Sequence, residues 1–178
     1  MQVRWKEFTN GIYSIPAKVH MKNNRIRFLA HNVRSLWNVG SFFRTADAMN
    51  VEKIYLTGYT GTPPRKEITK TALGAEKFIS WEKHEDPISV LKELKKEGWQ
   101  LVALELTADA KNIESFQWDK KICLIVGHEL TGVPEDILSM VDATVMIPML
   151  GKKESLNVAV AAGIALHQLR STSPRKGI

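Results

Sequence analysis

Six short apolar runs, separated by segments with helical spacing of apolar residues, constrain the fold of this chain most. The runs cover residues 26–30, 51–56, 78–81, 99–106, 121–126 and 143–147, and the helical segments cover 40–49, 87–96, 135–140 and 157–169. Continuous apolar runs are typical of strands buried on both faces. Strands that alternate with helices indicate an α/β fold, a parallel sheet with helices on both faces. The order of the strands does not follow from this pattern.

The length of 178 residues suits one domain with a buried core. We expect this domain over residues 26–170, between an N-terminal extension of residues 1–25 and a flexible basic tail of residues 171–178. No uncharged apolar run approaches the roughly 18 residues of a transmembrane helix, and the first residues lack the apolar core of a signal peptide. The single cysteine, Cys123, lies in an apolar run and is expected to be a buried hydrophobe. These features favour a cytoplasmic protein.

The formal net charge of +6 suits an anionic partner such as RNA, although basic solvated surfaces also occur without one. Several enzyme classes lack their motif here. No Gly-x-Gly-x-x-Gly follows the first strand, and neither a phosphate-binding Gly-Lys-Ser/Thr nor a Gly-x-Ser-x-Gly elbow occurs. The five histidines show no metal-ligand spacing, so we expect no metal.

Three loops, each placed where an apolar strand ends, hold the candidate chemistry. They span residues 31–44, 127–132 and 147–157. In a parallel sheet all three lie at the same edge, the carboxyl end of the strands, where ligands bind in open α/β folds. They carry the polar residues Asn38, Arg44, Glu129, Ser155 and Asn157.

Each of these residues also has a purely structural interpretation. Arg44 could be a solvated or ion-paired arginine on a helix. Glu129 could interact favourably with the positive, N-terminal end of the dipole of the helix that follows it. Ser155 stands where a helix N-cap is expected, and Asn157 could form local hydrogen bonds at the helix start. Only their convergence at one edge favours a shared site.

Three stretches resemble the motifs of one known family. They are Asn38-Val39-Gly40-x-x-x-Arg44-Thr45-Ala46-Asp47-Ala48, Leu124-Ile125-Val126-Gly127-His128-Glu129-x-x-Gly132-Val133 and Ile147-Pro148-Met149-x-Gly151-x-x-x-Ser155-Leu156-Asn157-Val158-Ala159-x-Ala161. In this order and spacing they resemble the motifs of the SpoU (TrmH) family of SPOUT RNA 2′-O-ribose methyltransferases, in its short single-domain type. The resemblance spans nearly the whole chain.

The resemblance implies a fold and an activity that the residues alone do not give. It implies a C-terminal deep trefoil knot that binds S-adenosylmethionine, and a homodimer with each active site at the interface. The implied reaction transfers a methyl group to a ribose 2′-hydroxyl, in tRNA more than in rRNA. The alternatives are a catalytically inactive RNA-binding protein of the same fold, and a nucleotide-binding α/β protein with other chemistry, for which no motif is present.

Site residues follow from the resemblance by position. The implied catalytic group is Arg44, Asn38, Glu129, Ser155 and Asn157, and the implied cofactor-binding residues are Leu104, Gly127, Ile147, Met149, Ser155 and Leu156. The basic residues that could contact RNA are Arg34, Arg65, Lys66, Lys70, Lys152 and Lys153. A guanidinium is a poor base, so we expect Arg44 to bind an RNA phosphate and stabilise a developing alkoxide. We expect Asn38 to orient Arg44 or the ribose.

One departure from the family pattern concerns the turn before the second strand. Asn50 stands where family members often have glycine. Asparagine tolerates the left-handed conformation, so we expect the turn to be kept.

Overall fold

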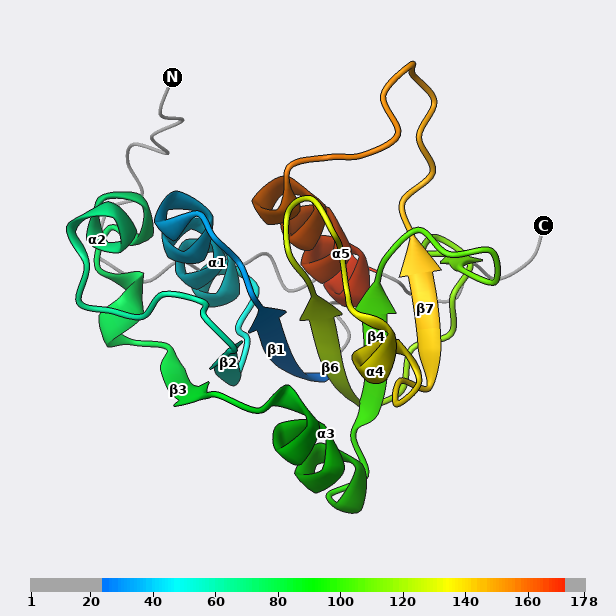
Figure 1. Ribbon diagram of the computed structural model, residues 1–178, viewed down its shortest axis with the longest axis horizontal. Coiled ribbons are helices and arrows are strands. Elements are labelled where there is room, and N and C mark those ends of the chain that lie inside the picture. Colours follow the sequence, from blue (N-terminus) through cyan, green and yellow to red (C-terminus); the bar gives the residue numbers. More distant parts are fainter. Residues whose placement is uncertain (1–23, 172–178) are drawn as a thin grey trace, which may run out of the picture.

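The structure, a computed structural model, describes residues 24–171. Nearly all of the expected extension (residues 1–25) and of the expected tail (residues 171–178) therefore lies outside the described residues. The described part is a sheet of seven strands flanked by helices (Figure 1).

Every strand pair in the sheet is parallel, and the strand order is β3-β2-β1-β6-β4-β7-β5. The strands are β1 (Arg25–His31), β2 (Lys53–Thr57), β3 (Ser80–His84), β4 (Gln100–Leu104), β5 (Lys111–Asn112), β6 (Lys121–Val126) and β7 (Ala143–Met146). The predicted parallel sheet is confirmed.

Helices cover both faces of the sheet, as predicted (Figure 1). On one face lie α1 (Leu36–Ala48), α2 (Lys66–Ala72) and α5 (Val158–Ser171), together with the short 3-10 helix η1 (Ala75–Lys77). On the other face lie α3 (Pro87–Lys96) and α4 (Glu135–Leu138). Each face has its own apolar core, with Phe28 and Phe42 in the first and Leu29 and Leu91 in the second.

The sequence predicts some elements better than others. The bounds of α3 and β6 are those predicted. The first helix begins at Leu36 instead of residue 40, and the third strand covers residues 80–84 instead of 78–81. Helix α2 and the two-residue strand β5 were not predicted, because the former lies in a segment rich in threonine, glycine and proline and the latter is very short.

Two local predictions are confirmed. Asn50 has a φ of 50°, the left-handed conformation that the turn before β2 requires. Cys123 is fully buried, and burial raises the pKa of its thiol to about 12, so it is an unreactive core residue. Among residues 24–171, no helix is both long and apolar enough to cross a membrane.

Candidate functional site

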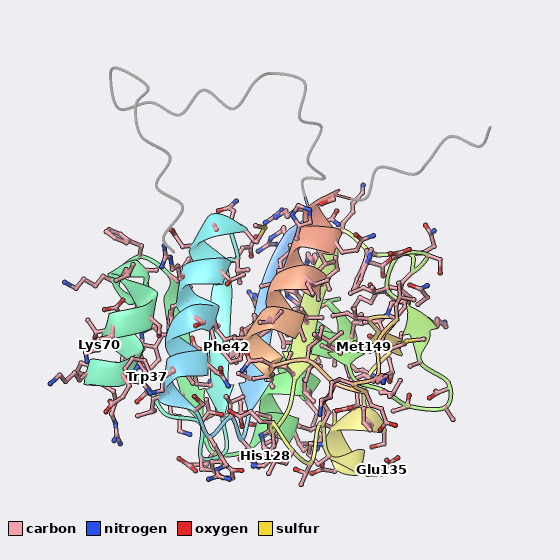
Figure 2. All side chains as sticks on the ribbon, turned by 90° about the horizontal axis from the view of Figure 1, so that it is seen from above. Trp37, Phe42, Lys70, His128, Glu135 and Met149 are labelled. Atoms are coloured by element: carbon pink, nitrogen blue, oxygen red, sulfur yellow. The ribbon has the colours of Figure 1, made fainter. Side chains whose placement is uncertain are left out.

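The three loops predicted to converge do meet at the carboxyl edge of the sheet. One residue from each forms a chain of hydrogen bonds, which we call the motif network (Asn38, Glu129 and Asn157). The Asn38 Nδ2 donates to Glu129 Oε1 over 3.0 Å, and the Asn157 Nδ2 donates to Asn38 Oδ1 over 3.2 Å. These contacts join residues 91 and 119 positions apart in the sequence. Figure 2 shows Trp37 and His128 toward the lower end of the molecule in that view.

Glu129 binds the N-terminus of α1 and not that of the helix that follows it. Its carboxylate accepts hydrogen bonds from the backbone N–H of Arg34 at 3.0 Å and of Ser35 at 2.9 Å. Partial burial disfavours the charged form, but these donors and the amide of Asn38 outweigh it, so the pKa of Glu129 is lowered. The carboxylate therefore stays ionised and fixes the first loop to the second.

Asn157, and not Ser155, is the N-cap of α5. The Asn157 Oδ1 accepts from the backbone N–H of Ala159 at 2.9 Å and of Val160 at 3.3 Å. The predicted cap at Ser155 is therefore wrong, because the cap stands two residues later, at Asn157, and the helix begins at Val158. The same Asn157 side chain caps α5 with its oxygen and holds Asn38 with its nitrogen, so it fixes the start of α5 to α1.

Arg44 lies on α1 apart from the motif network. Within residues 24–171 its exposed side chain makes no hydrogen bond and no ion pair. Arg44 follows Asn38 by six residues, so it points about 240° around the helix and lies about 9 Å further along it. The Asn38 side chain binds Glu129 and Asn157 and makes no hydrogen bond to Arg44. That Asn38 orients Arg44 or the ribose stays a prediction.

A cavity of about 130 Å³ opens between the ends of β4 and β7 and the start of α5, and one of its lining residues, Leu156, directly precedes Asn157 of the motif network. Five of the six predicted cofactor-binding residues line it: Leu104, Ile147, Met149, Ser155 and Leu156. Ser155 is exposed and thus free to donate its hydroxyl to a ligand. The cavity combines apolar walls with a hydroxyl at its rim.

Gly127, the sixth predicted cofactor residue, does not line this cavity. A β-carbon there would collide with the backbone carbonyl of Gly132. The loop closes on itself at this point, since the His128 N–H donates to Gly132 O at 3.0 Å and the Gly132 N–H returns a bond of 2.9 Å. Close approach of two backbone segments explains the glycine, and a cofactor contact at Gly127 stays a prediction.

Sequence reasoning missed two carboxylates at the cavity, Glu105 and Glu154. Glu105 accepts from the backbone N–H of Val133 at 2.8 Å and of Leu106 at 2.9 Å, so it connects β4 to the loop after β6. The signal that could have found Glu105 is its position directly after a strand at the carboxyl edge. Nothing in the sequence pattern distinguishes Glu154 from a solvated charge.

The six basic residues predicted to contact RNA are all exposed: Arg34, Arg65, Lys66, Lys70, Lys152 and Lys153. Arg65 and Lys66 stand at the start of α2, and the Lys70 Nζ lies 5.6 Å above the Trp37 ring (Figure 2). In the part of the chain that the structure describes, no group of three or more histidine, cysteine or acidic side chains could hold a metal ion.

The chain is similar to known RNA methyltransferases along most of its length. The model of the SpoU rRNA Methylase family matches residues 25–167. A tRNA (guanosine(18)-2′-O)-methyltransferase of Aquifex aeolicus is 35% identical over 150 residues, which cover 84% of this chain and 70% of that protein. The 23S rRNA (guanosine(2553)-2′-O)-methyltransferase RlmP of Bacillus subtilis is 32% identical over 161 residues, which cover 88% and 64%.

A solved structure supports the same relationship. The AdoMet-bound rRNA methyltransferase from Sinorhizobium meliloti matches with a TM-score of 0.76 at 28% identity, over 84% of this chain and 57% of that one. The three motifs, the network they form and these similarities agree. The chain belongs to the SpoU (TrmH) family of RNA 2′-O-methyltransferases.

Proposed function

We propose that this protein transfers a methyl group from S-adenosylmethionine to a ribose 2′-hydroxyl of tRNA. One observation carries the proposal: five of the predicted cofactor-binding residues line one cavity, and the last of them, Leu156, directly precedes Asn157 of the motif network. The named activity of the Aquifex relative on tRNA favours that substrate over rRNA. Both substrate and cofactor are found in the cytoplasm, where we propose that the protein acts.

The residues at the cavity fit S-adenosylmethionine by their chemistry. Leu104, Ile147 and Leu156 offer apolar surface to an adenine ring. Glu105 and Glu154 place carboxylates near a ligand that carries a sulfonium and an ammonium charge. When bound, the cofactor supplies an electrophilic methyl group on sulfur. Holding the ribose hydroxyl in line with that group provides much of the acceleration expected for such a displacement.

In the proposed reaction each of the polar residues has a separate role. Glu129 and Asn157 hold the two loops and α1 in place through Asn38. Ser155 donates its hydroxyl at the cavity. Arg44 binds an RNA phosphate and stabilises the negative charge that develops on the 2′-oxygen, while the proton leaves to the phosphate or to water. A guanidinium suits this role, since it stays charged and donates two hydrogen bonds in parallel.

We also propose that the active unit is a homodimer that packs through α1 and α5, which run side by side (Figures 1 and 2). Val160 and Ile164 on α5 are 51% and 41% exposed, and Trp37 on α1 is 47% exposed. Large apolar side chains left exposed on neighbouring helices are typical of an interface. Arg44 shares the exposed stripe of Trp37, seven residues earlier, so it lies on the proposed interface. We propose that a second subunit packed here receives Arg44 near its own network.

The family resemblance also implies the deep trefoil knot, and we propose that the C-terminal part of the chain has it. The segment between β7 and α5 is the part that would form the knotted cofactor loop. In support, the cavity is lined from both ends of this segment, by Ile147 at its start and by Ser155 and Leu156 at its end.

Transfer of labelled methyl groups from S-adenosylmethionine to unfractionated tRNA tests the proposal. We expect label in the ribose of one position, which ribose-methylation mapping identifies, and a loss of that site in cells without the gene. Binding of tRNA without transfer would instead identify an inactive RNA-binding relative. Label found in rRNA alone would support the proposed reaction but contradict tRNA as its substrate.

A further inference from the structure

An exposed tyrosine stands on a firmly held backbone at the carboxyl edge of the sheet. Tyr59 follows β2, and its side chain is 59% exposed. Its backbone N–H donates to Asn32 Oδ1 at 3.0 Å, and the N–H of Gly58 donates to His84 O at 3.1 Å. The Lys83 ammonium binds the carbonyls of Gly58 and Thr60 on either side. A ring presented in this way loses little conformational freedom when a ligand covers it.

The ring of His128 supports that of Tyr59. The two ring centroids are 6.3 Å apart, with the planes at 80° to one another. The His128 Nδ1 accepts hydrogen bonds from the backbone N–H of Leu130 at 3.0 Å and of Thr131 at 3.1 Å. These bonds fix the ring and place the proton of the neutral imidazole on Nε2, which remains available as a donor.

The ring pair is connected to the motif network on both sides. His128 precedes Glu129 in the same loop, and Asn32 lies two residues before Arg34, whose backbone N–H binds that carboxylate. The network itself contains two amides and one carboxylate, groups that can position a ribose or a loop but offer no surface to the face of a base. The rings of Tyr59 and His128 offer an aromatic surface to the face of a base, which the network does not.

We propose that Tyr59 and His128 form a stacking platform for an unpaired base of the substrate RNA, beside the methylated ribose. This inference rests on the proposed function, since it assigns the RNA-recognition role at the same site. Proteins recognise RNA sequence chiefly in unpaired loops, whose splayed bases stack on aromatic side chains. The base stacks on Tyr59, while His128 holds that ring and donates from Nε2 to the base or its phosphate. The platform thus selects RNA in which the target nucleotide lies in a loop.

Substitution at Tyr59 tests the platform in the full-length protein. Base–aromatic stacking contributes enough that Tyr59→Ala should raise the Kd and the KM for tRNA by roughly 5- to 150-fold. Tyr59→Phe keeps the ring and should stay close to wild type. His128→Asn keeps an acceptor for the two backbone N–H groups but removes the ring, and should weaken tRNA binding several-fold.

A matched control and a second measurement separate a local effect from a general one. Phe78 is 81% exposed but precedes β3, at the opposite end of the strands. Phe78→Ala should leave tRNA binding unchanged. Calorimetry with S-adenosylmethionine should give the same affinity for all four variants, since none of these residues lines the cavity. Photo-cross-linking of tRNA with mass spectrometry should locate the contact at Tyr59.

The outcomes for the platform and for the proposed function are distinguishable. If wild type methylates tRNA and Tyr59→Ala does so with an unchanged KM, the platform is overturned and the function stands. If wild type binds tRNA without methyl transfer and Tyr59→Ala loses that binding, the platform stands and the function fails. If wild type neither binds nor methylates tRNA, the platform is overturned together with the proposed tRNA substrate.

Discussion

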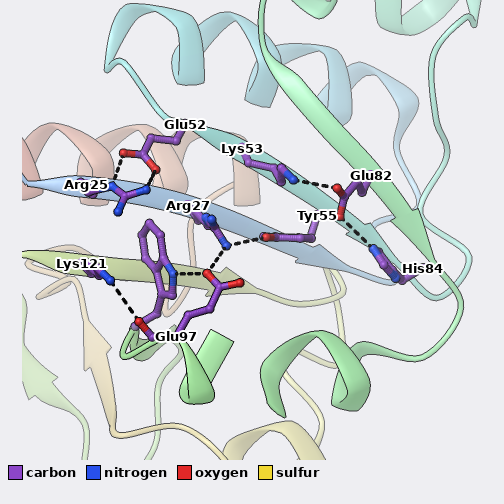
Figure 3. Close-up of polar contacts among 10 residues, drawn as sticks. Arg25, Arg27, Glu52, Lys53, Tyr55, Glu82, His84, Glu97 and Lys121 are labelled. Carbon is purple, nitrogen blue, oxygen red and sulfur yellow. Dashed lines mark hydrogen bonds and ion pairs between the residues drawn. The ribbon is translucent and has the colours of Figure 1, made fainter. Parts of the chain in front are cut away.

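Two regions of this sheet are rich in charged residues, and they use charge in opposite ways. Around Arg27, on the face that α3 covers, cations and carboxylates are matched within the chain (Figure 3). Arg25 binds Glu52 at 2.7 Å, Arg27 binds Glu97 at 3.0 Å, and Lys53 binds Glu82 at 2.7 Å. We call these six residues the Arg27 cluster. Both arginines also lie over the Trp99 ring.

The candidate RNA-binding cations lack such partners. Within residues 24–171, Arg44 makes no salt bridge. The same holds for all six candidate RNA-binding side chains: Arg34, Arg65, Lys66, Lys70, Lys152 and Lys153. Two carboxylates at the carboxyl edge, Glu129 and Glu105, are bound by N–H groups of the chain. A charge paired inside the chain supports the fold, while an exposed unpaired cation keeps its full attraction for a phosphate.

The largest effect that this comparison predicts is on activity at Arg44. Arg44→Ala should lower kcat by roughly 10²- to 10³-fold, as removal of one charge-stabilising donor does in other enzymes. The melting temperature should stay at the wild-type value, since the side chain has no partner within the described residues. Arg44→Lys is the informative companion: near-full turnover in steady-state assays would show that a planar, two-bond contact is not needed.

Glu129 should affect activity and stability together, because it lies at the carboxyl edge yet is bonded within the chain. Glu129→Gln places an N–H₂ where the Arg34 or Ser35 N–H requires an acceptor. We expect roughly 10²-fold slower transfer through misplacement of α1, and about 1–3 kcal/mol less stability. Chemical denaturation and methyl-transfer kinetics on the same preparation measure both. A change in only one of the two would separate the loop-holding role from the catalytic one.

A substitution in the Arg27 cluster should lower stability and leave activity unchanged, the opposite of what we expect for Arg44→Ala. Arg27→Ala removes hydrogen bonds to the Tyr55 hydroxyl at 2.9 Å and to Glu97, and uncovers the Trp99 ring. We expect a loss of about 1–3 kcal/mol in the free energy of unfolding. The kcat and the KM for tRNA of the remaining folded protein should be unchanged. Reduced tRNA affinity in this variant would mean that the paired cations also contact RNA.

Smaller effects are expected from the lysines of the loop before α5. Lys152→Ala and Lys153→Ala should each reduce the slope of log K against log salt by about 1 if the residue contacts a phosphate. Titrations of tRNA at several salt concentrations measure this slope. Lys121, whose ammonium binds the Glu97 carbonyl at 3.0 Å, offers the matched control, and Lys121→Ala should leave the slope unchanged.

The smallest predicted effect is the pH dependence of the Glu129 contribution. Because its pKa is lowered in the folded protein, the carboxylate stabilises the fold at pH values above its ordinary pKa. That contribution disappears as the pH falls through the folded-state pKa. The difference in melting temperature between wild type and Glu129→Gln should therefore be full above about pH 5 and shrink below about pH 4. A constant difference across this range would contradict the assignment.

The sequence predicts what depends on local pattern and on the parallel arrangement. Continuous apolar runs predicted the parallel sheet, and helical spacing predicted the start of α3 at residue 87. The structure adds the cap there, since the Asp86 carboxylate accepts from the N–H of Ile88 and Ser89. The convergence of the three loops followed from parallel strands alone. The family resemblance, and not periodicity, supplied the residues that line the cavity.

Features that depend on contacts between residues far apart in the sequence could not be predicted from it. Helix α1 extends back to Leu36 because Glu129, more than ninety residues away, accepts from the N–H groups before it. Asn157 caps α5 in place of Ser155 because it also bonds to Asn38 on α1. Strand order and the pairing of Arg27 with Glu97 likewise depend on how distant segments pack.

A mixing experiment with two inactive variants tests the central claim most directly. If Arg44 serves the motif network of a second subunit, co-expressed and co-purified Arg44→Ala and Asn157→Ala chains form mixed dimers with one intact site each. Random pairing then restores about a quarter of wild-type methyl transfer, although each variant alone is nearly inactive. No restored activity in purified mixed dimers would contradict the composite site.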